Sequence, residues 1–151
     1  MKVQDVMRRE ARSCGPETDL ATVGRLMAEI GGGALPVVEA ERVVGMFTDR
    51  DLALAVADRD VVPSDLRVRD FLSGEVFVCR ADEDVHAVLE NLRAWRVRRL
   101  PVVDRRGGLE GLLSLDDIAA AAREGSGEGP TWSEIGHTLA EIVRHPLPIH
   151  R

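Results

Sequence analysis

The chain has 151 residues and a formal net charge of −6, with 44% hydrophobic and 30% charged residues, which suits one core or two small halves that share one. It contains no apolar run of roughly 18 residues and its first residues lack the apolar region of a signal peptide, so we expect a cytoplasmic protein without membrane contact. The negative charge disfavours nucleic-acid binding, which needs clustered positive charge. Several arginines between Arg93 and Arg106 leave a local anion site open.

The second half of the chain repeats the first. Val3 matches Val68 at an offset that stays constant through the Leu-Pro-Val-Val segments at 35–38 and 100–103. One extra residue in the segment 104–108 shifts the offset by one, after which the match resumes. Such register over a whole half indicates duplication. The matched pairs include Asp5 and Asp70, Cys14 and Cys79, Asp19 and Asp84, Gly45 and Gly111, and Asp51 and Asp117.

The hydrophobic pattern predicts the same order of elements in each half. A half of this size cannot cover its own sheet, so we predict an α+β fold. In it, two β-α-β-β-α repeats, residues 1–60 and 61–124, pack through their sheets about a pseudo-two-fold axis. The expected elements are helical turns at 3–7 and 68–72, strands at 12–14 and 76–79, amphipathic helices at 19–30 and 84–95, strands at 35–38 and 100–103, turns at 39–42 and 104–108, strands at 43–47 and 109–113, and helices at 52–57 and 118–123.

A C-terminal helix is expected outside the duplicated body. Residues 125–130 are rich in glycine and read as a linker, and 131–151 begin with a capping box, Thr131-Trp132-Ser133-Glu134. One apolar stripe follows on a helix that ends near Arg144, before two prolines. The helix either covers its own body or a dimer mate, or it binds a separate protein partner. The stripe comprises Trp132, Ile135, Leu139, Ile142 and Val143.

Catalysis and metal binding are not expected. Cys14 and Cys79 have no CxxC or Cys/His spacing and read as small buried thiols. The histidines show no metal-ligand spacing and no pairing with a nucleophile. Asp116 and Asp117 are adjacent on a helix and point about 100° apart, so they do not form an acid–base pair.

The motif Thr48-x-x-Asp51 recurs as Ser114-x-x-Asp117, and it has two interpretations. A hydroxyl followed three residues later by an acid forms a capping box, which needs no ligand. Alternatively, the helix N-terminus attracts a phosphate while the carboxylate accepts hydrogen bonds from the two hydroxyls of a ribose. Gly45 would then let a ligand approach the preceding strand without a Cβ clash, as would Gly111 in the second half.

The doubled frame, Leu-Pro-Val-Val-acid followed by Gly, two apolar residues and [Ser/Thr]-x-x-Asp, resembles a pair of CBS domains, the Bateman module. The Val3–Met7 opening fits the same family, and the resemblance covers about four-fifths of the chain. It implies two clefts related by pseudo-symmetry, which in this family commonly bind AMP, ADP, ATP or S-adenosylmethionine. It also implies a homodimer.

The resemblance assigns the site residues by position. Asp51 and Asp117 match the ribose-binding carboxylates, and Thr48 and Ser114 match the hydroxyls beside them. Arg98 and Arg99 match a basic pair that binds phosphate in some members; a solvated turn is the alternative. The first half has Gly33 and Ala34 at that position, which leaves space for an adenine ring but supplies no charge. We therefore predict two unequal clefts. Trp95 is expected in the core or at a dimer interface rather than stacked on a base.

The predicted function is that of a non-catalytic sensor that binds an adenosine-containing ligand and signals to a partner or across a dimer. It requires no cofactor, since the adenine nucleotide or S-adenosylmethionine acts as a regulatory ligand. The alternative is a ligand-free module for dimerisation or protein interaction.

Overall fold

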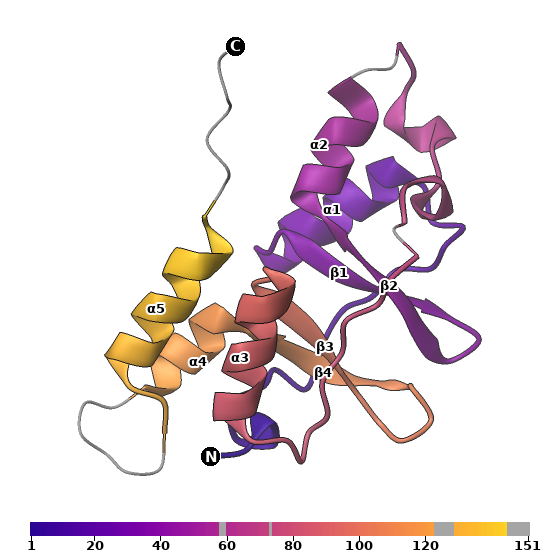
Figure 1. Cartoon of the computed structure of the whole chain (residues 1–151). Helices are drawn as coiled ribbons and strands as arrows, with labels where there is room; N and C mark the ends of the chain where they lie inside the picture. The colour runs from indigo at the N-terminus through magenta and orange to yellow at the C-terminus, as the bar shows by residue number, and fades with distance from the viewer. Residues whose placement is uncertain (58–59, 73, 123–128, 145–151) are drawn as a thin grey trace, which may run out of the picture.

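A computed structural model describes residues 1–57, 60–72, 74–122 and 129–144. It contains two antiparallel hairpins, each preceded and followed by a helix, and a C-terminal helix beside the two helices that flank the second hairpin (Figure 1). This confirms the predicted α+β fold. The elements are η1 (Val3–Asp5), α1 (Leu20–Ile30), β1 (Ala34–Glu39), β2 (Arg42–Thr48), α2 (Asp49–Ala57), η2 (Pro63–Asp65), η3 (Val68–Phe71), α3 (Val85–Trp95), β3 (Arg99–Val103), β4 (Leu109–Ser114), α4 (Leu115–Ala121) and α5 (Trp132–Ile142).

The two hairpins keep the irregularities of a common ancestor. In β1–β2 the register shifts between Val37 and Val38, and in β3–β4 it shifts at the equivalent Val102 and Val103. The turns differ. Ala40 and Glu41 both have positive φ in the first, as a two-residue turn between twisted strands requires. The longer second turn uses Gly107 at φ 87° and the Asp104 carboxylate, which accepts from the backbone N–H of Arg106 and Gly108.

The strands expected at 12–14 and 76–79 shrink to one paired residue each. Cys14 pairs in parallel with Val37, and Cys79 pairs with Val102. Cys14 N–H donates to the Pro36 carbonyl at 3.0 Å and its carbonyl accepts from Val38 N–H at 2.8 Å. Both pairings lie beside the register shift, where the hairpin bends away and prevents a longer third strand.

Helix ends follow the capping chemistry. Asp19 caps α1 by accepting from Thr22 N–H, and Asp84 caps α3 by accepting from His86 N–H. Gly31 ends α1 in the left-handed conformation, and Arg96 ends α3 in the same conformation at φ 54°, where a side chain is unfavourable. The helices expected at 52–57 and 118–123 begin three residues earlier, because the hydroxyl-x-x-Asp motif itself forms their first turns.

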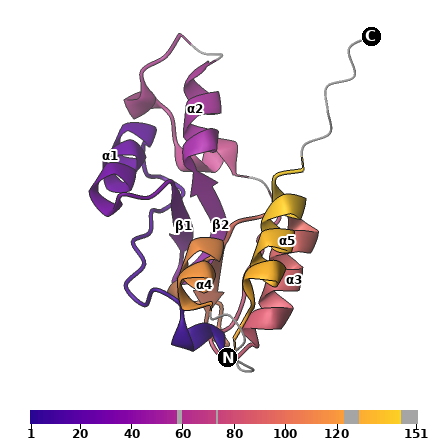
Figure 2. The same ribbon diagram turned by 90° about the vertical axis from the view of Figure 1, so that its left-hand side faces the viewer.

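The N-terminal segment of each repeat packs into the hydrophobic core of the other repeat. Val3 is buried in the core of the second repeat, and Val68 is buried in the core of the first. Backbone hydrogen bonds hold both segments in place: Val3 N–H donates to Glu83, and Val68 N–H donates to Thr18. β1 contacts β4 and β2 contacts β3, so the repeats meet through their sheets, with one hairpin above the other (Figure 2).

Helix α5 packs against α3 and α4 of its own body (Figures 1 and 2). Ile135 and Thr138 are buried in this contact, and the Thr131–Glu134 capping box forms as predicted. The described body covers only part of the apolar stripe, however, since Trp132 is 52% exposed and Leu139 and Val143 are also exposed. The linker at 125–128 and the tail at 145–151 lie outside the described residues. Within the described part of the chain, no helix is long and apolar enough to cross a membrane.

Candidate functional site

The Ser114–Asp117 motif forms a full capping box at the start of α4. Asp117 N–H donates to Ser114 Oγ at 3.1 Å, while the Asp117 Oδ2 atom accepts both from Ser114 N–H at 3.0 Å and from the Ser114 hydroxyl. The motif therefore does form the capping box predicted for it. It uses only one of the two carboxylate oxygens, so a further interaction at Oδ1 remains open to this side chain.

Arg8 occupies that second oxygen. Its Nε donates to Asp117 Oδ1 at 2.8 Å, although the two residues are 109 positions apart. The side chain of Asp117 is 12% exposed and that of Arg8 is 68% exposed. The hydrogen bond and the charge of Asp117 raise the pKa of the Arg8 guanidinium. The exposed guanidinium of Arg8 thus covers the Asp117 carboxylate, which is largely buried.

Asp117 lies in a hollow of about 190 Å³ between the two repeats. Gly33 and Ala34 form one wall from the first repeat, and Ser114 and Arg99 face them from the second. The cleft therefore brings together five of the eight predicted site residues. Its remaining lining comprises Arg8, Glu10, Ala11, Arg12, Ile30, Gly31, Gly32, Leu112 and Asp116.

The arginines around this cleft are held by carboxylates. Arg99 Nη2 lies 3.9 Å from Asp116 Oδ2, and Arg98 Nη2 donates to Asp116 Oδ1 at 3.3 Å. Arg12 pairs with Glu29 at 3.4 Å. Arg99 lines the cleft, whereas Arg98 does not. The predicted basic pair is thus divided, with one guanidinium available to a ligand phosphate in this cleft.

The Thr48–Asp51 motif of the first repeat lies outside the cleft around Asp117. Thr48 N–H and Oγ1–H donate to Asp51 Oδ2 at 2.8 and 2.7 Å, the same geometry as its counterpart. Among the described residues, no arginine pairs with Asp51. Thr48, Asp51 and Arg98 therefore do not join the cleft around Asp117, and the two copies differ at the free carboxylate oxygen.

The two motif glycines serve the fold, which corrects their expected role toward a ligand. A Cβ on Gly111 would lie 2.5 Å from the Arg8 carbonyl oxygen, because the backbone of Arg8 pairs with Leu112 directly above it. A Cβ on Gly45 would lie 2.9 Å from a methyl group of Leu72. In both repeats the chain itself fills the space over the glycine.

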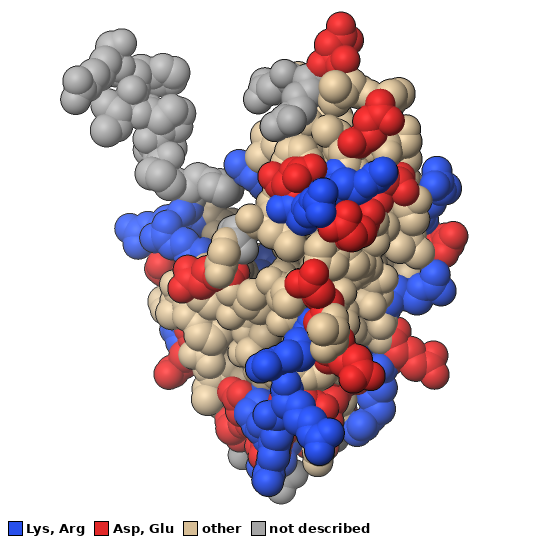
Figure 3. Space-filling model, turned by 90° about the vertical axis from the view of Figure 1, so that its right-hand side faces the viewer, with Lys and Arg blue, Asp and Glu red and all other residues tan. Residues whose placement is uncertain are grey.

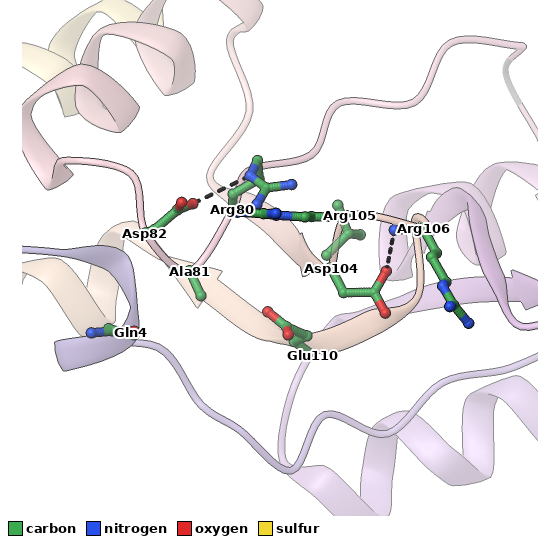
Figure 4. Close-up of a pocket in the computed structure, with 9 residues that line it drawn as sticks. Gln4, Arg80, Ala81, Asp82, Asp104, Arg105, Arg106 and Glu110 are labelled. Carbon is green, nitrogen blue, oxygen red and sulfur yellow. Dashed lines mark hydrogen bonds and ion pairs between the residues drawn. The ribbon is translucent and has the colours of Figure 1, made fainter.

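A second hollow, of about 380 Å³, lies beside the β3–β4 turn. Arg105 and Arg106 rise from that turn opposite Arg80, and Glu110 projects from β4 (Figure 4). Arg80 pairs with Asp82 at 3.2 Å and Asp104 caps the turn, so the lining carries both signs of charge. The whole face shows the same close mixture (Figure 3). This mixture does not favour an anion such as nucleic acid.

The remaining candidates serve the core. Burial raises the pKa of the Cys14 thiol to about 11 and that of Cys79 to about 12, so both stay protonated and unreactive. Trp95 stacks on Phe77 with ring centroids 4.7 Å apart and packs against the second core. Among the described residues, no three His, Cys, Asp or Glu side chains cluster as metal ligands would.

Arg8, Arg12 and Asp116 are cleft residues that sequence reasoning did not assign to the site. Arg8 follows the Val3–Met7 opening immediately, but no local pattern marks its approach to Asp117. The one available signal was Gly111, because a glycine inside a strand often marks a place where another backbone approaches closely. Here that is the backbone of Arg8.

The model of the CBS domain family matches residues 3–58 and 68–124. The CBS domain-containing protein YhcV of Bacillus subtilis is 28% identical, and the match covers 89% of this chain and 95% of YhcV. The uncharacterized protein MK0525 of Methanopyrus kandleri is 29% identical over 78% of this chain and 61% of its own length. The inosine-5′-monophosphate dehydrogenase of Thermoplasma acidophilum is 30% identical, but this chain matches only 27% of that enzyme.

Solved structures share the fold. Protein TA0289 of Thermoplasma acidophilum, of unknown function, has a TM-score of 0.77 at 20% identity. The match covers 93% of this chain and 75% of the TA0289 chain. The CBS domain pair of protein MJ0100, solved with 5′-methylthioadenosine and S-adenosyl-L-methionine, has a TM-score of 0.72 at 20% identity over 80% of this chain and 94% of its own. CBSX2 in complex with AMP has a TM-score of 0.68 at 27% identity, with the same coverage of both chains.

Proposed function

The chain belongs to the CBS domain family, and from this premise we propose that it is a non-catalytic regulatory module that binds an adenosine-containing ligand between its repeats. The cleft around Asp117 carries this proposal. It joins a half-enclosed carboxylate to a hydroxyl, a small-residue wall and guanidinium groups. The AMP complex of the similar CBSX2 supports the same class of ligand.

Each part of the cleft suits one part of a nucleotide. A carboxylate oxygen accepts hydrogen bonds from vicinal hydroxyls, as a ribose presents them. Gly33 and Ala34 have little or no side chain, which leaves room for a flat base. The Arg99 guanidinium offers a planar fork for a phosphate. The candidate ligands are AMP, ADP, ATP and S-adenosylmethionine.

Because the cleft lies between the repeats, a ligand there contacts both. Binding would favour the arrangement of the repeats that fits the ligand, through its differential affinity for alternative arrangements. We propose that this arrangement is read by a partner protein or by a second copy of the chain in a homodimer. The protein would carry out this role in the cytoplasm.

Isothermal titration of the purified chain with AMP, ADP, ATP and S-adenosylmethionine tests the proposal. At least one of them should bind with measurable heat. At a ligand concentration about 100 times Kd, the free energy of unfolding should rise by about 2.7 kcal/mol, visible as a higher melting temperature. The absence of both heat and a melting shift for all four ligands at millimolar concentration would overturn it.

A ligand-free interaction module is the second candidate function. The exposed apolar side chains of α5 favour it, since Trp132, Leu139 and Val143 lie at helical spacing on a face that its own body leaves uncovered. This candidate predicts a stable oligomer in light scattering whose mass does not respond to any of the four ligands.

A further inference from the structure

The two copies of the ribose-type aspartate differ in one respect. Both use Oδ2 to bind the hydroxyl and N–H of their capping residue. Asp117 has its Oδ1 atom paired with Arg8, whereas no described arginine reaches Asp51. The second repeat carries Ser73 at the sequence position that matches Arg8. The arginine is therefore an addition to one cleft only.

Arg8 has a fixed backbone and a free side chain. Its N–H donates to the Leu112 carbonyl at 2.9 Å, and its carbonyl accepts from Leu112 N–H at 2.9 Å. These bonds hold its Cα at the edge of the cleft. The Arg8 side chain is 68% exposed and that of Asp117 is 12% exposed, so water solvates the guanidinium once the pair opens, while Asp117 keeps its hydrogen bonds from Ser114. The guanidinium can therefore leave Asp117 without disturbing the strand below.

Both partners of this ion pair line the cleft. Its volume of about 190 Å³ is below the roughly 300–1,000 Å³ typical of small-molecule sites, and Arg8 forms part of its wall. A ribose that binds Asp117 needs the Oδ1 atom that Arg8 occupies. Ligand and arginine thus compete for one oxygen.

We propose that Arg8 is a specificity residue of this cleft: its guanidinium blocks Asp117 in the free protein, is displaced by the ligand's ribose, and then binds the ligand's phosphate. The inference rests on the proposed function and selects among its ligands. A nucleoside without a phosphate must displace Arg8 and forms no new contact with its guanidinium. A nucleotide recovers a charge-assisted contact. S-adenosylmethionine brings a sulfonium cation toward arginines and is disfavoured.

Titration of adenosine, AMP and S-adenosylmethionine into the wild-type chain and Arg8→Ala tests this at one fixed salt concentration. In Arg8→Ala, adenosine and S-adenosylmethionine should bind as tightly as before or several-fold more tightly. AMP should bind about tenfold more weakly, the loss expected for one hydrogen bond to a charged group. Only the ligand with a phosphate should therefore lose affinity.

Arg9→Ala is the matched control. Arg9 is the adjacent residue, and among the described residues its guanidinium donates only to the backbone carbonyl of Gln4, so its loss should change none of the three affinities. Arg8→Lys keeps the charge and should retain most of the preference for AMP over adenosine. Melting curves of all three variants should match the wild type, which separates binding effects from folding.

Two outcomes distinguish this inference from the function beneath it. If the wild type binds AMP and Arg8→Ala weakens AMP and adenosine equally, or changes neither, Arg8 does not discriminate and the inference fails alone. If neither the wild type nor Arg8→Ala binds any adenosine-containing ligand, both fail. A variant that binds adenosine when the wild type does not would support the blocking role directly.

Discussion

At the scale of single residues, Gly45 and Gly111 occupy equivalent positions but face different neighbours. A Cβ on Gly111 would press against a carbonyl oxygen of the backbone, and one on Gly45 against the end of a flexible leucine side chain. We expect Gly111→Ala to lower the free energy of unfolding by about 2 kcal/mol, within the range for overpacking. Gly45→Ala should cost less than about 1 kcal/mol, because a leucine rotamer can adjust. Urea unfolding of the two variants measures the difference.

The two glycine variants also serve as controls for each other. Both substitutions remove a glycine from the middle of a strand and so change the entropy of the unfolded chain alike. Only the contact above the strand differs. Equal losses would mean that the segment carrying Arg8 moves aside as easily as the Leu72 side chain, and the backbone pairing of Arg8 would then be looser than the 2.9 Å hydrogen bonds indicate.

At the scale of elements, α5 depends on Glu134 at its first turn. Thr131 donates to this carboxylate through its backbone N–H and its hydroxyl, and His86 on α3 lies 2.9 Å away. These interactions lower the pKa of Glu134 to about 2 from an ordinary 4.5. The ionised side chain therefore stabilises the folded state above about pH 4.5, and this contribution is lost as the pH falls through the lower value.

We expect Glu134→Gln to lower the free energy of unfolding by about 0.5 kcal/mol at pH 7, because a side chain that is 45% exposed is screened by water. The gap between wild type and variant should shrink as urea unfolding is repeated from pH 5 down to pH 3. Glu141→Gln, on the same helix with a 3.7 Å pair to Arg144, is the control. A gap that stays constant with pH would contradict the role of the charge.

Local patterns predicted most elements. Helical periodicity located α1 and α3, and the doubled Leu-Pro-Val-Val segments located β1 and β3. The strands at 12–14 and 76–79 were too long because the register shifts that limit them belong to the neighbouring hairpin. The apolar stripe of α5 was predicted, but not which of its residues its own body covers, since sequence shows which residues are apolar but not how wide a groove receives them.

At the scale of the whole molecule, the two copies of the aspartate motif have different surroundings. The wall of small residues and Arg99 lie with Asp117, and Arg8 pairs with Asp117, whereas no arginine of the described residues pairs with Asp51. We expect Asp117→Asn to weaken AMP binding by roughly 10–100-fold, the loss expected for hydrogen bonds to a charged acceptor. Asp51→Asn, its duplicate, should change AMP affinity by less than about threefold. Titration calorimetry compares them.

Equal weakening by both variants would contradict the inequality and indicate two occupied clefts. The sequence predicted two unequal clefts from Gly33 and Ala34 at the position where the second half has arginines. This stays a prediction, because Gly33, Ala34 and Arg99 all line the one cleft around Asp117. The sequence could not place Arg99 in the Asp117 cleft, because each cleft takes residues from both repeats. The sequence also could not identify Arg8 as a cleft residue. A contact between an exposed side chain and a residue 109 positions away produces no periodic pattern in the sequence.

The exchanged N-terminal segments bear on how such a molecule could arise. Val3 completes the core of the second repeat, and Val68 completes the core of the first. An ancestor with a single repeat would have lacked this residue in its own core and could have gained it only by trading segments with another copy. Fusion of two such copies would turn this exchange between two chains into contacts within one chain. Neither descendant half can be cut away as an independent unit, because each holds a piece of the other's interior.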